Sequence, residues 1–182
     1  MKIVTTQVMQ HLRQVIKDTV TPSSMRGVPS NFGDAAAGSV KADEWRTMFT
    51  IYIPIALVTL WGKGSSHDEP DGERDALDHT MALASAITLA CKNTMTVARA
   101  VDYRSCVETW LRDLQQLYPH IRGRTNNHMA LHIYDFLLLF GPVRSWWCFP
   151  FERVNGQLQR QPSNHKFGKP LNANVLYFLM LI

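Results

Sequence analysis

The chain has 182 residues, of which 46% are hydrophobic and 19% charged; this is enough apolar side chain for one well-buried core and excludes a disordered chain. Its 19 Lys and Arg exceed its 15 Asp and Glu, and the net charge of +4 permits contact with nucleic acid without requiring it. Cys91, Cys106 and Cys148 are too widely spaced for a disulfide framework or a CxxC metal pair, so we expect reduced thiols and an intracellular protein.

No secretory or membrane-spanning segment is predicted. Polar side chains interrupt residues 1–20, whereas a signal peptide has a continuous apolar core. The longest apolar run, residues 48–61, contains Pro54 and is shorter than the roughly 20 residues that a helix needs to cross a bilayer. Residues 175–182 are a shorter apolar run that indicates the start of a buried element. We therefore expect no membrane partner, and a nuclear location if the chain is functional.

The first third of the chain predicts two helices separated by a long loop. Apolar residues at helical spacing predict a helix over 4–20. Prolines, glycines and serines follow over 21–39, and a loop of this length predicts a functional segment or one laid across a partner surface. Asp43 is placed to cap the next helix, and Pro54 predicts a kink within it, because the proline ring removes a backbone donor.

The rest of the chain continues the helical pattern. The predicted elements are a charged loop over 62–72, a helix from Glu73 or Asp75 with an apolar stripe to Met95, a helix from Asp102 to just before Pro119, and a helix over about 126–140 that ends at Gly141-Pro142. No alternating strand pattern longer than a few residues occurs. The prediction is a mainly α fold, an irregular multi-helix domain with long loops that forms one domain over 1–182.

Three residues of the fifth predicted helix share one face. His128, His132 and Asp135 stand at i, i+4 and i+7. Two histidines at this spacing can hold a transition metal, but metalloproteases that use such a pair add a glutamate base, where this chain has Met129, and a distant third ligand. The favoured interpretation is structural: the histidines satisfy polar groups inside a helical core, and Asp135 orients one of them.

The segment that follows changes abruptly from aromatic to charged. Its aromatic residues predict a core anchor, and Pro150 predicts the first turn of another helix, where Glu152 faces the positive end of the helix dipole. The alternative is a carboxylate held rigidly for a divalent metal in phosphoryl transfer. The aromatic residues in question are Trp146, Trp147, Phe149 and Phe151.

Cations and asparagines are scattered through the last third of the chain. The candidate binding residues among them are Arg144, Arg153 and Arg160. Such side chains hold phosphates while aromatic rings stack on bases, but a solvated helical surface displays the same residue types. Both interpretations stay open at this point.

Two stretches of the chain resemble a known family. The sequences "KADEWRTMFTIYIPIALVTLWG" and "NNHMALHIYDFLLLFGPVRSWWCFPFERVNGQLQR", with "SNHKFGK" after them, are similar to the helical domain of unknown function that follows the transposase domain in CACTA-type (En/Spm) DNA transposons, in its fungal form. The likeness covers about residues 9–169. The positions that match the family's motif are His128, His132, Gly141, Pro142, Val143, Phe149, Pro150, Phe151, Glu152 and Arg153.

This resemblance implies an origin in a transposase, whose chemistry is two-metal hydrolysis and strand transfer by an Asp-Asp-Glu triad on a ribonuclease-H-like core. In related transposases a helical insertion precedes the final glutamate, which commonly stands in a Glu-Arg motif, so Glu152 is by analogy the third metal-binding carboxylate. Such a core carries its first two aspartates on or beside strands, and no such sheet is predicted before residue 126. We therefore do not expect the chain to be an enzyme alone.

Three hypotheses of function follow. The leading one is a transposon-derived, non-catalytic helical module that binds protein or DNA, or is a relic. The second is a split transposase, in which another polypeptide supplies the two aspartates, this chain supplies Glu152, and Mg²⁺ or Mn²⁺ is a cofactor only in that assembly. The third is a metal-binding helical protein that uses His128, His132 and Asp135. Outside the split assembly no cofactor is expected, and the candidate partners are a transposase core or DNA.

Overall fold

The computed structural model of the chain describes residues 5–22, 27–38, 40–63, 71–121 and 123–159. It divides into two compact units, Met1–Trp146 and Trp147–Ile182, and each is described by itself. The described residues are mainly helical and include no strand, so the predicted mainly α class is confirmed. None of the helices in these ranges is long and apolar enough to span a membrane. Most of the charged loop 62–72, Arg160 and the apolar residues 175–182 lie outside the described residues.

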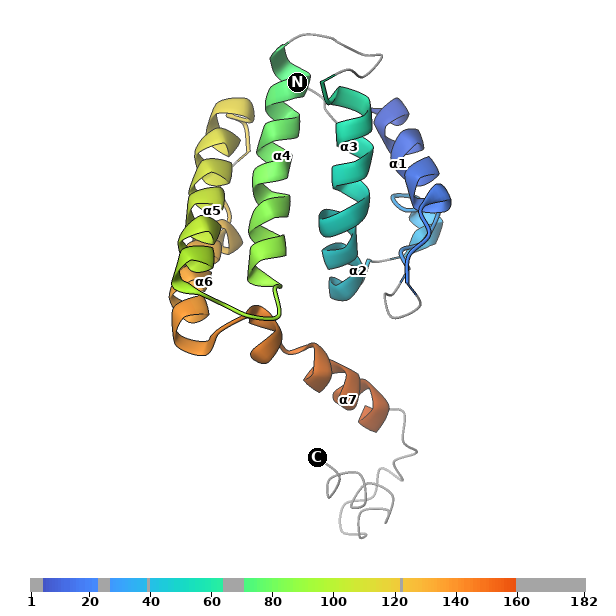
Figure 1. Cartoon of the computed structure of the whole chain (residues 1–182). Coiled ribbons are helices and arrows are strands. Elements are labelled where there is room, and N and C mark those ends of the chain that lie inside the picture. Colours follow the sequence, from blue (N-terminus) through green and yellow to red (C-terminus); the bar gives the residue numbers. More distant parts are fainter. Residues whose placement is uncertain (1–4, 23–26, 39, 64–70, 122, 160–182) are drawn as a thin grey trace. The chain divides into compact units, whose positions relative to one another are not determined.

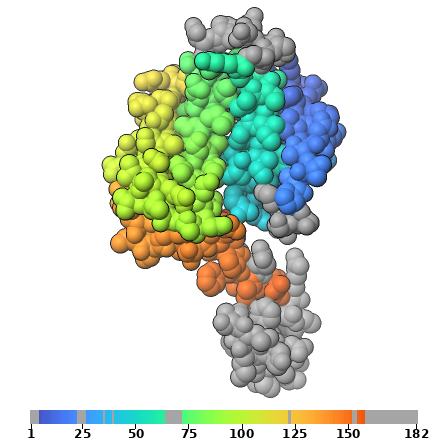
Figure 2. Space-filling view, viewed as in Figure 1, coloured from blue at the N-terminus to red at the C-terminus, as the bar shows by residue number. Residues whose placement is uncertain are grey.

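The helices of the first unit are α1 (Thr6–Asp18), α2 (Ala42–Thr47), α3 (Ile53–Trp61), α4 (Asp71–Ala90), α5 (Val97–Leu117) and α6 (Thr125–Phe140). Helices that follow one another in sequence also pack against one another, so that α3 contacts α4, α4 contacts α5, and α5 contacts α6, while α1 packs on α3. Successive long helices run in opposite directions (Figure 1). The space-filling view shows α1, α3, α4 and α5 side by side on one face (Figure 2).

The helix after the long loop begins two residues earlier than predicted. Asp43 does not cap it, because the helix starts at Ala42 and Lys41 is the residue with extended backbone before it. The side chain that satisfies the first turn belongs to Glu44, whose Oε2 accepts the Lys41 backbone N–H at 2.8 Å. A glutamate at the third helical position can accept the backbone N–H of the capping residue in this way. Asp43 therefore lies in the first turn of the helix and is not its cap.

Pro54 is accommodated by a π turn. The five residues Met48–Tyr52 form a π-helix that joins α2 to α3, and the Ile53 backbone N–H donates to the carbonyl of Met48, five residues earlier. Proline has no N–H and its ring crowds the carbonyl four residues before it, so a regular α-helix would be broken at this point. The wider π turn provides the local change of geometry that was predicted as a kink, one turn before the proline.

The connection between α4 and α5 also differs from its prediction. The apolar stripe was expected to carry one helix to Met95 and the next was expected to open at Asp102, but α4 ends at Ala90 and α5 begins at Val97. The side chain of Thr96 accepts the backbone N–H of Arg99 at 3.3 Å, which caps α5 at its first turn. The two helices are thus joined by a short turn over 91–96.

Three clusters of buried side chains hold the first unit together. One lies between α1, residue 28 of the loop, the π turn and α3; a second joins α3 to α4; and a third joins α4, α5 and α6. Tyr103 lies in the third cluster, and its hydroxyl donates to the Ala130 carbonyl at 2.8 Å, which links α5 to α6. The members are Leu12, Ile16, Val28, Met48, Tyr52 and Ala56; Leu57, Leu60, Trp61, Ala76 and Leu77; and Ala86, Ala90, Ala100, Tyr103, Val107 and Leu137.

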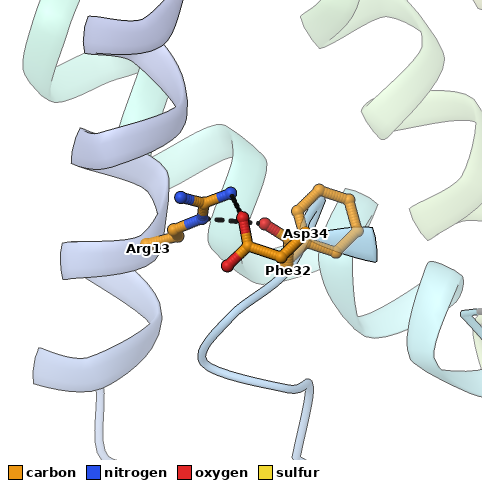
Figure 3. Close-up of polar contacts among 3 residues, drawn as sticks. All are labelled: Arg13, Phe32 and Asp34. Atoms are coloured by element: carbon orange, nitrogen blue, oxygen red, sulfur yellow. Dashed lines mark hydrogen bonds and ion pairs between the residues drawn. The ribbon is translucent and has the colours of Figure 1, made fainter. Parts of the chain in front are cut away.

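The described part of the predicted loop over 21–39 lies on α1. The Nε–H of Arg13 donates to the Phe32 carbonyl at 2.9 Å, and the same guanidinium pairs with the carboxylate of Asp34 (Figure 3). Gly33, between these two partners, has φ +82°, a conformation that favours glycine. Val28 is buried in the first cluster. Residues 27–38 therefore pack against α1 and the first buried cluster of the same unit.

We expect Arg13→Met to lower the free energy of unfolding by about 1–2 kcal/mol, because it removes a hydrogen bond to a half-buried carbonyl as well as an ion pair. Asp34→Asn removes only the charge of a partly exposed pair and should lower it by at most about 1 kcal/mol. Urea unfolding of the two variants and the double variant measures both terms. Arg112→Gln is the control, because Arg112 is exposed and pairs with Asp113 of the same helix; a loss from Arg13→Met no larger than that of the control would contradict this account.

Candidate nucleic-acid interface

Cations from three segments meet at one end of the first unit. The η3 turn, Val143–Ser145, carries Arg144, whose Nη1 donates to the Asn93 side-chain carbonyl at 2.8 Å in the α4–α5 turn. Arg46 of α2 and Arg144 both act electrostatically on the thiol of Cys91. Figure 1 shows the start of α2, the α4–α5 turn and η3 at this same end. We call Arg46, Cys91, Lys92, Asn93 and Arg144 the basic cluster.

The end of α6 positions Arg144. As predicted, α6 stops at Phe140, and Gly141 has φ +77°, which redirects the chain into η3. The Trp146 indole N–H donates back to the Gly141 carbonyl at 3.1 Å, and its ring meets the Phe136 ring edge-on at a centroid distance of 5.8 Å. The turn that carries Arg144 is thus closed by a hydrogen bond across it and packed against α6.

The α4–α5 turn is held by a second arginine. The Nη1 group of Arg99 donates to the backbone carbonyl and to the hydroxyl of Thr94, at 2.8 and 2.6 Å. Lys92, in the same turn, is exposed. The acidic side chains in the first turn of α2 are Asp43 and Glu44, and the carboxylate of Glu44 accepts the Lys41 backbone N–H. The cations on the elements that meet here are Arg46, Lys92, Arg99 and Arg144.

Cys91 is a packing residue within the basic cluster. Partial burial raises the pKa of its thiol, and this effect outweighs the opposing influence of the two arginines. A thiol with a raised pKa carries little thiolate near neutral pH and is a poor nucleophile. Cys91, Cys106 and Cys148 form no disulfide bond with one another. The chemistry of this end is therefore that of the arginine and lysine side chains.

The histidine face of α6 is not inside the core. His128, His132 and Asp135 are all exposed, so the favoured interpretation that the two rings satisfy polar groups in a helical core is wrong. The buried side of α6 carries Leu137 instead, with Leu131 and Ile133 packed around the same cluster. Helical spacing placed the three residues on one face, but the face that packs on α5 is a different one.

Two imidazoles nevertheless meet on that exposed face. The Nε2 atoms of His128 and His132 lie 3.1 Å apart, and the rings are nearly perpendicular. Asp135 Oδ2 lies 3.7 Å from His132 Nδ1, on the opposite side of the ring from Nε2. Within the described residues no three His, Cys, Asp or Glu side chains are arranged to hold a metal ion, so Asp135 does not complete a three-ligand site with the histidines.

The second unit contains α7, Phe149–Gln159. Pro150 stands in its first turn, as predicted, and the rings of Trp147 and Phe149 stack at a centroid distance of 4.7 Å. Phe151, which was expected to help fill the core, is exposed. Glu152 and Arg153 lie within the helix, but their side chains are outside the description, and Arg160 lies beyond it. The inherited catalytic role of Glu152 and the binding roles of the two arginines stay predictions.

His79 of α4 is a buried polar residue that the sequence analysis did not single out. Its Nε2–H donates to the Trp110 carbonyl at 3.2 Å, and its ring stacks on the Trp110 indole and lies 5.6 Å from the ring of Tyr118. Burial lowers the pKa of the His79 imidazole, against the opposing effects of this hydrogen bond and of the Asp113 carboxylate. His79 stands two residues after Leu77 in the sequence, and this position in the apolar pattern does not predict that its side chain is buried and hydrogen-bonded.

Comparison with protein-family models, with curated proteins and with solved structures finds no match in any of the three. The resemblance to the transposon-associated domain therefore stays a prediction, as does the function that it implies.

We expect His79 to make stability depend on pH below about 6.5, its ordinary pKa. Because the folded-state pKa is lowered, the unfolded chain binds the proton first, so the contribution is complete above that pH and declines as pH falls, by at most about 1.4 kcal/mol per pH unit. Urea unfolding at pH 7.5 and 5.5 measures the loss, which should be smaller in His79→Gln. His120→Gln, at an exposed site, should keep the wild-type difference, and an equal loss in all three chains would refute the assignment.

Proposed function

We propose that this chain is a transposon-derived, non-catalytic helical module that binds nucleic acid through the basic cluster. The observation that carries the proposal is the convergence of Arg46 of α2 and Arg144 of the η3 turn, which are far apart in the sequence, around the turn that holds Lys92. Cations on separate rigid elements are held at fixed positions. Such cations match the regular spacing of backbone phosphates better than scattered surface charges do.

The chemistry of the cluster favours the sugar-phosphate backbone as the ligand. Guanidinium groups bind phosphate oxygens through paired N–H donors, and the ammonium group of Lys92 adds a mobile point charge. The five residues of the basic cluster carry no aromatic ring themselves, and they lie on turns and one short helix. Binding should therefore be independent of base sequence and strongly dependent on salt.

The all-α fold supports the non-catalytic part of the proposal. A ribonuclease-H-like core displays its first two aspartates on a central sheet, and the described residues before α6 contain only helices, turns and loops. A two-metal reaction needs several carboxylates converging on the ions. This chain would contribute to such a reaction only in the split assembly, where Glu152 of α7 would be its one carboxylate.

The decisive experiment is fluorescence anisotropy of the purified chain with a labelled DNA duplex of random sequence, at increasing salt concentration. Arg46→Gln, Lys92→Gln and Arg144→Gln should each weaken binding, and each should reduce the slope of log affinity against log salt by roughly one, the effect of losing one phosphate contact. A second duplex of different sequence should bind with the same affinity.

Arg112→Gln is the matched control, because it removes one exposed positive charge from the far part of α5, where Arg112 pairs with Asp113. It should leave the salt slope unchanged. Thermal unfolding of each variant identifies any loss of stability. The largest loss is expected for Arg144→Gln, because this substitution removes the hydrogen bond from Arg144 to Asn93. Absence of DNA binding by the wild-type chain, or equal weakening by Arg112→Gln, would reject the proposal.

A further inference from the structure

We propose that His128 and His132 form an open, two-ligand site for a divalent transition-metal ion on the exposed face of α6. Residues at i and i+4 of a helix lie above one another, and here the two rings bring the same atom, Nε2, to within 3.1 Å of each other. The site is separate from the basic cluster and does not depend on the proposed nucleic-acid binding. The ions concerned are those that prefer imidazole nitrogen, namely Cu²⁺, Ni²⁺ and Zn²⁺.

The distance between the two nitrogen atoms suits a shared metal ion. Metal–nitrogen bonds of about 2.0–2.1 Å place two tetrahedral ligands roughly 3.3 Å apart and two adjacent square-planar ligands roughly 2.9 Å apart. The Nε2 atoms of His128 and His132 are 3.1 Å apart, between these two values. The pair therefore needs little rearrangement to chelate one ion.

Asp135 supports this role from the other side of His132. Its Oδ2 lies 3.7 Å from Nδ1 of that ring. This separation is longer than a hydrogen bond, so the carboxylate acts on the ring through its negative charge, which favours a proton on Nδ1 and leaves the lone pair of Nε2 available to a metal. An acid in this position orients a metal-binding histidine without touching the ion. Asp135 is thus a positioning residue of the site and not a metal ligand.

The surroundings define what kind of site this is. Both histidines are exposed, so the remaining coordination positions are open to water or to a donor from another molecule. A two-ligand open site binds more weakly than a closed four-ligand structural site, and its affinities should follow the order Cu²⁺ above Ni²⁺ and Zn²⁺. A direct hydrogen bond between two neutral rings would also bring the nitrogens to this distance, and it is the competing explanation of the geometry.

Isothermal titration of Cu²⁺ and of Zn²⁺ into the full chain at pH 7.5, with the thiols alkylated, distinguishes the two explanations. The wild-type chain should bind one ion at this site, and His128→Gln and His132→Gln should each weaken that binding at least tenfold, because a chelate becomes a single ligand. His120→Gln is the matched control, an exposed histidine outside α6, and it should bind as the wild type does.

A second readout is independent of total metal uptake. In a histidine-detected NMR spectrum, Zn²⁺ should shift the His128 and His132 ring signals together and leave the His79 signals in place. Asp135→Asn should weaken binding less than either histidine substitution does, since Asp135 does not contact the ion. Binding that is equal in His128→Gln, His132→Gln and His120→Gln, or no binding by the wild-type chain, would overturn the proposal and leave only the hydrogen bond between the rings.

Discussion

The packing of α4 on two sides is the constraint on which the rest of the first unit depends. Near its start α4 places Ala76 and Leu77 against α3, and near its end it places Ala86 and Ala90 against α5. Alanines let helix backbones approach closely, and here the small side chains lie where α4 faces Ala100 of α5. Helix α1 packs chiefly on α3 and helix α6 chiefly on α5, so their placement follows from the helices that α4 holds on its two sides.

The same packing brings the basic cluster together. Because α4 ends at Ala90, a buried residue, the turn that follows it begins inside the protein, with Cys91 partly buried. Arg46 and Arg144 reach that turn from either side, one from the helix before α3 and one from the turn after α6. The cluster is therefore a product of tertiary structure, and weakening the α4–α5 contact should disperse its charges as well as lower stability.

The sequence predicted the end of a helix correctly where a distinctive residue marks it. It predicted the end wrongly where the apolar pattern continues past the last helical residue. Gly141-Pro142 ends α6 as predicted because a glycine with positive φ is an unambiguous stop. The end of α4 was misplaced because apolar residues continue at helical spacing to Met95, while the cap is made by a single threonine hydroxyl, that of Thr96. Apolar periodicity predicts which side of a helix is buried, but it does not predict at which residue the helix ends.

The candidate sites show the same limit. The i, i+4 spacing correctly placed His128 beside His132, but no local pattern says whether such a face looks towards solvent, because that depends on which side of α6 meets α5. Of the arginines singled out in the sequence, Arg144 lies in the basic cluster, whereas Arg46 and Lys92 were not selected. Their convergence depends on contacts between residues about 50 to 100 positions apart, which periodicity and spacing do not report.

The π turn before Pro54 has a consequence for the two helices that it joins. An α-helix turns by about 100° per residue, so the one extra residue in a π turn rotates everything after it by about that angle. Before the turn, Trp45 meets the Phe32 ring of the loop; after it, Leu57 and Leu60 face α4. Deleting one residue there would remove the extra residue of the π turn and swing one of these faces out of contact. The length of this segment is thus fixed by the two neighbours it must reach, and not by the helix itself.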